Sequence, residues 1–299
     1  MSIRAKITEV ILKSMKTREI FDLPDDELFN KVIEMNKKRG LRTLKLDDRC
    51  RDEMIMEKYH CVRIRPKKGG INGAVLFIFG GGNMVDCDNG DISVAKRIAD
   101  TKNVEVWFPC YPLLTDHSMT DTVEMLYEVY SRMLNEYSHD KITFLGFSSG
   151  AAQSLILCEY NNALGKKLPM PKQVIAVSPG SCCDDADIKE SLRELDKKDV
   201  MIPSSFLGKV RKMIEQHGED IPEYMICTEK GDLSGVPMIH FFYGAYETLY
   251  AVAPKFEENC QKHNVPYTMT VGKGMFHCYP MFTFYPEGKQ GFNEILGYI

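Results

Sequence analysis

One serine in this sequence has neighbours that favour its use as a nucleophile. Residues 146–150, with the letters GFSSG, form a G-x-S-x-G pattern that occurs once in the 299 residues. A short β-rich apolar run at 141–145 precedes the pattern, and a helix-like run at 151–158 follows it. A sharp turn between a strand and a helix strains the backbone of the central serine and exposes its hydroxyl group. The pattern predicts that Ser148 attacks a carbonyl carbon; an ordinary serine in a glycine-rich turn is the alternative.

A serine nucleophile needs a histidine base, and the chain contains seven histidines. After a nucleophile on such a turn, the acid comes next in the sequence and the histidine last. His277 follows the last predicted strand, 266–271, by a short loop. Ligands meet parallel sheets at the carboxyl ends of strands, so His277 is the predicted base. His240 lies inside the predicted strand 236–243 and is expected to be a core residue, whereas His217 lies in a charged insertion.

The predicted acid is Glu247, the first acidic residue after the strand at 236–243. A carboxylate there would hold the His277 imidazole and stabilise its cation. The alternative is a glutamate in the first turn of a helix, where it favours the helix dipole. Asp232 precedes the strand and is a poorer candidate.

A glycine-rich loop follows the predicted strand 73–79 and could hold the negative charge of a tetrahedral intermediate. Its residues 79–83 read FGGGN. Glycines let backbone N–H groups turn towards a substrate oxygen, so the predicted oxyanion hole consists of the amides of Gly81, Gly82 and Ser149. The adjoining residues predicted to contact substrate are Gly80, Asn83 and Phe147. A phosphate loop is disfavoured because G-x-x-x-x-G-K-[ST] is absent.

Apolar strands alternate with helices from about residue 59 onwards. The predicted strands are 59–65, 73–79, 103–108, 141–146, 172–178, 236–243 and 266–271, and the predicted helices are 91–100, 119–137, 150–162, 247–263 and 287–298. This alternation indicates an α/β fold with a mostly parallel sheet covered on both faces. Residues 1–55 are predicted to form N-terminal cap helices. Residues 56–299 are predicted to form the core, with a cap insertion at 181–235.

Composition excludes several classes of protein. The formal net charge of −4, without a basic block, argues against nucleic acid as a partner. The longest apolar run is too short to span a bilayer, and the N-terminus lacks the apolar region of a secretion signal. The ten cysteines show no C-x-x-C or zinc-finger spacing, so we expect free buried thiols, a cytoplasmic location and no metal or cofactor.

These motifs resemble those of the α/β-hydrolase superfamily, specifically the hormone-sensitive-lipase-like (fold-3) esterases. The resemblance covers roughly residues 59–299. Residues 79–82 correspond to the family's HGGG loop, 146–150 to its GDSAG elbow, 244–249 to its G-x-x-D-x-L acid motif and 274–279 to its final histidine motif. It implies a mostly parallel eight-stranded sheet with a helical cap in two parts.

Three positions depart from the family pattern. Phe79 replaces the histidine of HGGG, Glu247 replaces the commoner aspartate, and Phe147 replaces a polar residue before the nucleophile. None of them removes a member of the triad, but they make this chain a divergent relative.

The leading interpretation is a carboxylesterase that acts on small esters with short acyl chains. The base should have a pKa of about 6–7.5 if His277 is little perturbed. An amidase, formamidase or small peptidase with the same triad is the first alternative, and a non-catalytic ligand-binding relative is the second. The expected partner is a small-molecule ester, and a homodimer is possible for this kind of sheet. Met and aromatic residues of the cap, such as Met15, Phe21, Phe29, Met201, Phe206 and Met213, could line an acyl pocket, although plain packing inside the cap is the more common use.

Overall fold

The computed structural model describes residues 2–14, 16–216 and 220–299. Within them, eight strands form one sheet in the order β1-β2-β4-β3-β5-β6-β7-β8. The strands are β1 (Cys50–Ile55), β2 (Tyr59–Ile64), β3 (Ala74–Ile78), β4 (Glu105–Cys110), β5 (Ile142–Phe147), β6 (Gln173–Val177), β7 (Ile239–Gly244) and β8 (Tyr267–Gly272). Strand β2 is antiparallel to both of its neighbours, and the other pairs are parallel. The predicted mostly parallel, eight-stranded sheet is confirmed.

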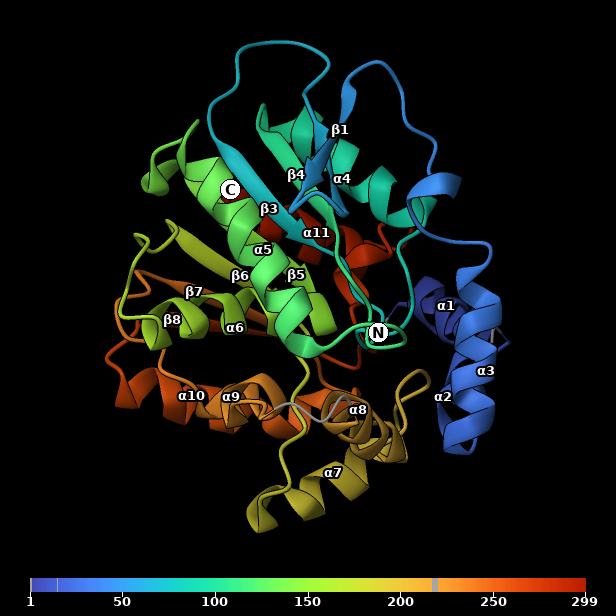
Figure 1. Cartoon of the computed structure of the whole chain (residues 1–299). Coiled ribbons are helices and arrows are strands. Elements are labelled where there is room, and N and C mark those ends of the chain that lie inside the picture. Colours follow the sequence, from blue (N-terminus) through green and yellow to red (C-terminus); the bar gives the residue numbers. More distant parts are fainter. Residues whose placement is uncertain (1, 15, 217–219) are drawn as a thin grey trace.

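Helices cover both faces of this sheet (Figure 1). Helices α5 (Met119–Leu134) and α6 (Ser149–Ala163) pack together on one face, and α4 (Asn89–Lys102) and α11 (Pro286–Tyr298) pack together on the other. The central strands β3, β5 and β6 are buried along their whole length, as strands covered on two faces must be. In the described part of the chain, none of the helices combines the length and apolar character needed to cross a bilayer.

The remaining helices belong to the N-terminus, to the insertion after β6, and to the segment before β8. They are α1 (Ile3–Ser14), α2 (Thr17–Asp22), α3 (Asp25–Asn36), α7 (Lys189–Asp196), α8 (Ser205–Glu215), α9 (Glu223–Ile226) and α10 (Ala253–Lys262). The prediction of one continuous helix over 247–263 is wrong at its start. Its first turn is a 3₁₀ segment, Thr248–Val252, and the α-helix starts only at α10, where Pro254 fits the first turn.

Strand β1 corrects the predicted boundary of the N-terminal helices at residue 55. Residues 50–55 pair with β2 and belong to the sheet. The sequence does not reveal β1 because it is an edge strand in which only Ile55 is buried and Arg51, Asp52 and Met54 are exposed, so it lacks the apolar pattern of a buried strand. Charged side chains on an edge also discourage pairing with other chains.

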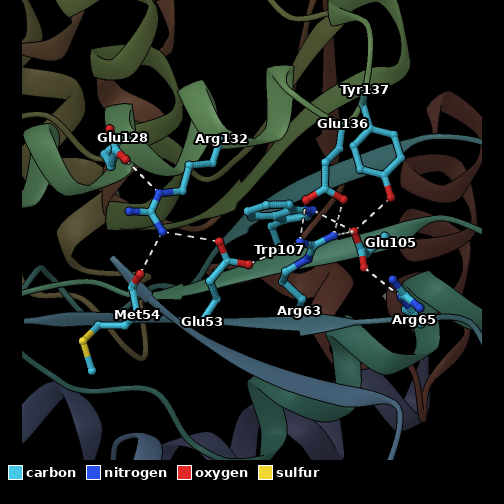
Figure 2. Close-up of polar contacts among 10 residues, drawn as sticks. All are labelled: Glu53, Met54, Arg63, Arg65, Glu105, Trp107, Glu128, Arg132, Glu136 and Tyr137. Carbon is cyan, nitrogen blue, oxygen red and sulfur yellow. Dashed lines mark hydrogen bonds and ion pairs between the residues drawn. The ribbon is translucent and has the colours of Figure 1, made fainter. Parts of the chain in front are cut away.

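A buried arginine joins this edge of the sheet to the end of α5 (Figure 2). The Arg63 guanidinium donates 2.6 Å hydrogen bonds to Glu105 and Glu136 and lies 4.1 Å above the Trp107 ring. Glu105 is only 1% exposed, and its Oε2 also accepts from Trp107 and Tyr137. The carboxylate of Glu105 therefore depends on a dense set of donors that β2, β4 and the α5 terminus provide together.

Replacing Arg63 with alanine should lower the free energy of unfolding by about 3–5 kcal/mol, because it leaves the Glu105 charge buried without its main partner. Urea denaturation followed by circular dichroism measures this change. The matched control is Arg51→Ala, since Arg51 is exposed on the neighbouring strand. If Arg63→Ala and Arg51→Ala lower the urea midpoint of unfolding equally, the buried network around Arg63 does not stabilise this edge of the sheet.

Candidate active site

Ser148 lies at the turn between β5 and α6, in a strained backbone conformation with φ 54° and ψ −123°. The two glycines of the pattern are required by close packing. A Cβ atom on Gly146 would lie 2.1 Å from the carbonyl oxygen of Gly150, and one on Gly150 would lie 2.1 Å from that of Ile78. The helix can therefore start directly against β3 and β5, which turns the Ser148 side chain away from the core.

His277 is the histidine that the fold brings to Ser148. Its Nε2 atom lies 2.9 Å from the Ser148 Oγ, across 129 residues of sequence. With the imidazole proton on Nδ1, Nε2 accepts the hydrogen bond from the serine hydroxyl. The Cys278 sulfur also lies 3.4 Å from Nε2. The loop after β8 therefore supplies a base within the range required for proton transfer.

Glu247 stands on the other side of the imidazole. Its Oε2 lies 3.2 Å from His277 Nδ1, which is an ion-pair distance without the alignment of a full hydrogen bond. Contacts of this kind commonly tighten when substrate binds. Glu247 is fully buried, and it precedes the 3₁₀ segment Thr248–Val252 with extended backbone angles. The fold thus brings the three predicted residues into one row, Glu247, His277 and Ser148.

Two residues that the sequence did not single out hold Glu247 in place. The Ser178 hydroxyl donates to Glu247 Oε2 at 2.8 Å and accepts from the Cys278 amide at 3.1 Å. The buried Asp199, from the segment predicted as an insertion, accepts at 2.7 Å from the Thr248 amide. No motif marks either residue, because each acts through a contact between segments far apart in the sequence.

Burial and neighbouring charge act against each other in this row. Burial raises the pKa of the Glu247 carboxyl, although the His277 imidazole and the Ser178 hydroxyl both favour its ionised form. Burial alone would lower the pKa of His277, but the adjacent Cys278 sulfur and the Glu247 carboxylate raise it above its ordinary value. The pKa range of about 6–7.5 predicted from the sequence applies to a little-perturbed histidine, and His277 is strongly perturbed.

The glycine loop lies beside Ser148 with its amides available. Gly81 and Gly82 have φ angles of 139° and 62°, which favour glycine. Among the described residues, no group accepts a hydrogen bond from either amide. Ser149 is the first residue of α6, so its amide has no partner within the helix. All three predicted oxyanion donors thus remain free for a ligand.

Phe79 explains how the loop is held without the family's histidine. Its ring stacks on Tyr111 at 4.2 Å and on Phe108 at 5.6 Å, and its carbonyl accepts from the Tyr111 hydroxyl at 2.9 Å. Stacked aromatic rings and one buried hydrogen bond therefore fix the start of the loop. The divergent residue leaves the glycines in place.

The predicted contact residues all lie at the cavities around Ser148. Gly80 and Phe147 line one of them, and Asn83 lines the other. Of the Met and aromatic residues suggested for an acyl pocket, three line these cavities, Phe21, Met201 and Phe206, while Phe29 and Met213 line neither. Met15 and His217 lie outside the described residues.

The other titratable groups do not extend the site. His240 is buried in β7, where it stacks on Tyr298 and contacts Thr268 Oγ1 at 2.8 Å, and burial lowers its pKa to about 4, as suits the predicted core residue. All ten cysteines are free, and eight of them are buried. Over the described residues, no three His, Cys, Asp or Glu side chains are grouped to hold a metal ion.

Comparison with known proteins agrees with the fold described above. A family model described as "alpha/beta hydrolase fold" matches residues 75–281, more than half of the chain. The esterase of Acinetobacter venetianus is 25% identical over 266 residues, covering 84% of this chain and 85% of that protein.

Solved structures of similar fold include two esterases. The crystal structure of the esterase EstE5, soaked with p-nitrophenyl butyrate, superimposes with a TM-score of 0.82 at 20% identity and covers 100% of this chain and 98% of the other. An esterase from the bacterial hormone-sensitive lipase family gives a TM-score of 0.79 at 19% identity, covering 100% and 97%. The likenesses show the fold, and the family match decides membership: the chain belongs to the α/β-hydrolase family, as its motifs predicted.

Proposed function

We propose that the protein is a carboxylic ester hydrolase that cleaves small esters with short acyl chains, using Ser148, His277 and Glu247. The observation that carries this proposal is the 2.9 Å contact between Ser148 Oγ and His277 Nε2 at a strained turn, beside free backbone amides. A serine paired with an oriented histidine and facing an oxyanion hole is suited to acyl transfer.

Acylation begins when Ser148 Oγ attacks the acyl carbon and its proton moves to His277 Nε2. The carbonyl oxygen becomes an oxyanion and receives hydrogen bonds from the amides of Gly81, Gly82 and Ser149. The tetrahedral intermediate then collapses, the bond between the acyl carbon and the alcohol oxygen breaks, and His277 gives its proton to that oxygen. The products are the free alcohol and an ester on Ser148.

Deacylation repeats these steps with water as the nucleophile. His277 takes a proton from the water as its oxygen bonds to the acyl carbon, and Ser148 Oγ leaves with that proton. Glu247 remains ionised and stabilises the imidazolium in both halves of the reaction. The carboxylic acid is released, and the free enzyme returns.

The helices around the site fit a cap over it. The Phe21 ring of α2 stacks on the Phe206 ring of α8 at 4.3 Å, and Arg18 forms a 3.0 Å ion pair with Asp196 of α7. The N-terminal helices and the insertion after β6 therefore contact each other beside Ser148. We assign the N-terminal helices and the insertion after β6 to the cap. Strand β1 belongs to the sheet. A homodimer stays a prediction.

Covalent labelling tests the nucleophile directly. A fluorophosphonate should add one phosphonyl group per chain, at Ser148, and abolish p-nitrophenyl acetate hydrolysis in proportion. Intact-protein and peptide mass spectrometry locate the label. A matched pair, p-nitrophenyl acetate and p-nitroacetanilide, separates ester from amide preference. An active enzyme that is labelled at another residue, or not at all, would contradict the assignment of Ser148.

A further inference from the structure

Two unequal cavities meet at Ser148. The inner cavity encloses about 60 Å³, and the outer cleft encloses about 400 Å³. Apolar side chains of α6, α8 and α9 line the inner cavity: Ala152, Ile156, Leu207, Ile214 and Met225. Apolar side chains of the N-terminal helices and of the loop after β8 line the outer cleft: Ile20, Phe21, Met35, Met281 and Phe282. An ester bound at Ser148 would therefore have one half in a small space and the other in a large one.

The position of His277 decides which half lies where. His277 lines the outer cleft but not the inner cavity. In acylation the imidazole must give its proton to the oxygen of the departing alcohol, so that oxygen has to face the side of the ring that lines the outer cleft. The alcohol half then extends into the outer cleft. The acyl half, on the opposite side of the attacked carbon, points into the inner cavity beside Ser149 and Asn83.

Phe206 is the largest side chain that lines both spaces, which also share Gly82, Ser148 and Ile202. Its ring borders both, and it reaches the oxyanion loop so closely that a Cβ atom on Gly82 would lie 2.6 Å from its Cζ. Its other side stacks on Phe21 of α2 at 4.3 Å. The ring is thus held between the loop and the N-terminal helices, at the place where the inner cavity and the cleft meet.

We propose that the substrates of this enzyme join a small acyl group to a bulky, apolar alcohol, and that Phe206 sets this selectivity. The proposal rests on the proposed esterase function. The new part of the proposal is the identity of the alcohol half, which the catalytic triad does not restrict. Part of the cleft is polar, since its lining includes Arg39 and Asp88, which are half-exposed and paired at 3.0 Å, so we place the apolar part of the alcohol against the apolar side chains of this lining.

Two isomeric esters test the direction of binding. Cyclohexylmethyl acetate carries the ring on its alcohol, and methyl cyclohexylacetate carries the same ring on its acyl group. A single methylene changes selection in an apolar pocket by about 10–200-fold, so kcat/KM should favour cyclohexylmethyl acetate by about 100-fold or more. Equal or reversed values, in an enzyme that hydrolyses p-nitrophenyl acetate, overturn the substrate proposal alone. If none of the three esters is hydrolysed, the result counts against the esterase function itself.

Substitutions at Phe206 test the role of this ring. Phe206→Ala should lower the ratio of the two kcat/KM values by about tenfold or more, because the acyl half gains access to the cleft, and Phe206→Leu should lower it by less. If the alanine variant does not fold, Phe206→Leu alone tests the role of the ring. The control is Phe29→Ala in α3, which removes a half-buried ring of the N-terminal helices outside both cavities and should leave the ratio unchanged. A wild-type ratio in both Phe206 variants would contradict a role for this ring.

Discussion

Ser148→Ala is expected to reduce kcat for p-nitrophenyl acetate by about 10⁶-fold, and His277→Ala by a similar factor. The reason is that the hydroxyl and the imidazole, 2.9 Å apart, act as one unit: without either, no acyl-enzyme forms at an appreciable rate. The double variant should therefore be no slower than either single variant. A residual rate should remain, because the amides of Gly81, Gly82 and Ser149 are untouched.

Steady-state kinetics of the three variants, purified in parallel with wild type, measure these losses. Ser154→Ala is the matched control, since Ser154 is a buried serine of the helix that follows Ser148 and its hydroxyl donates to the Gly150 carbonyl. Its kcat should stay close to that of wild type. A Ser148→Ala rate within tenfold of wild type would assign the nucleophile to another residue, and a double variant much slower than the singles would show that the two side chains act separately.

The parts of the site that could be predicted are those for which the backbone itself imposes the residue type. Gly146 and Gly150 are needed because any Cβ there would meet backbone atoms at 2.1 Å, and Gly82 is needed for its φ of 62°. Such requirements leave a trace in the sequence. His277 and Glu247 could be found because parallel strands end at one edge of the sheet, so loops that follow β7 and β8 converge on the turn that follows β5.

The parts that could not be predicted depend on contacts between distant segments. Ser178 follows β6 and bonds to Glu247, 69 residues later, and Asp199 reaches the Thr248 amide from a segment interpreted only as a charged insertion. Phe79 is a similar case: the sequence shows that a histidine is missing, but only the packing shows that Tyr111 and Phe108 replace its role. Strand β1 was missed because its pairing, and not its composition, makes it a strand.

Glu247→Gln should reduce kcat/KM by about 10⁴-fold while leaving the fold intact. The amide keeps the shape of the side chain, but it has no charge to stabilise the imidazolium, and its orientation no longer fixes the His277 proton on Nδ1. In the wild type, the negative charge of Glu247 helps to raise the pKa of His277. Removing that charge lowers the pKa, so the acid limb of the kcat/KM profile should lie above pH 6.5 in wild type and move to lower pH in the variant.

Glu247→Asp asks a separate question, because aspartate is the commoner acid in this family. The Thr248 amide is fixed to Asp199 at 2.7 Å, so the loop has little freedom to advance a shorter side chain towards His277. A misplacement of about 1 Å costs on the order of 10²-fold, and that is the expected loss for this variant. Stopped-flow and steady-state rates from acid to neutral pH measure both effects, with Glu258→Gln, an exposed glutamate of α10, as the control. Should Glu247→Gln keep both the rate and the acid limb of wild type, the carboxylate that orients His277 would have to be sought elsewhere, with the buried Asp199, which contacts this loop from the insertion after β6, as the next candidate.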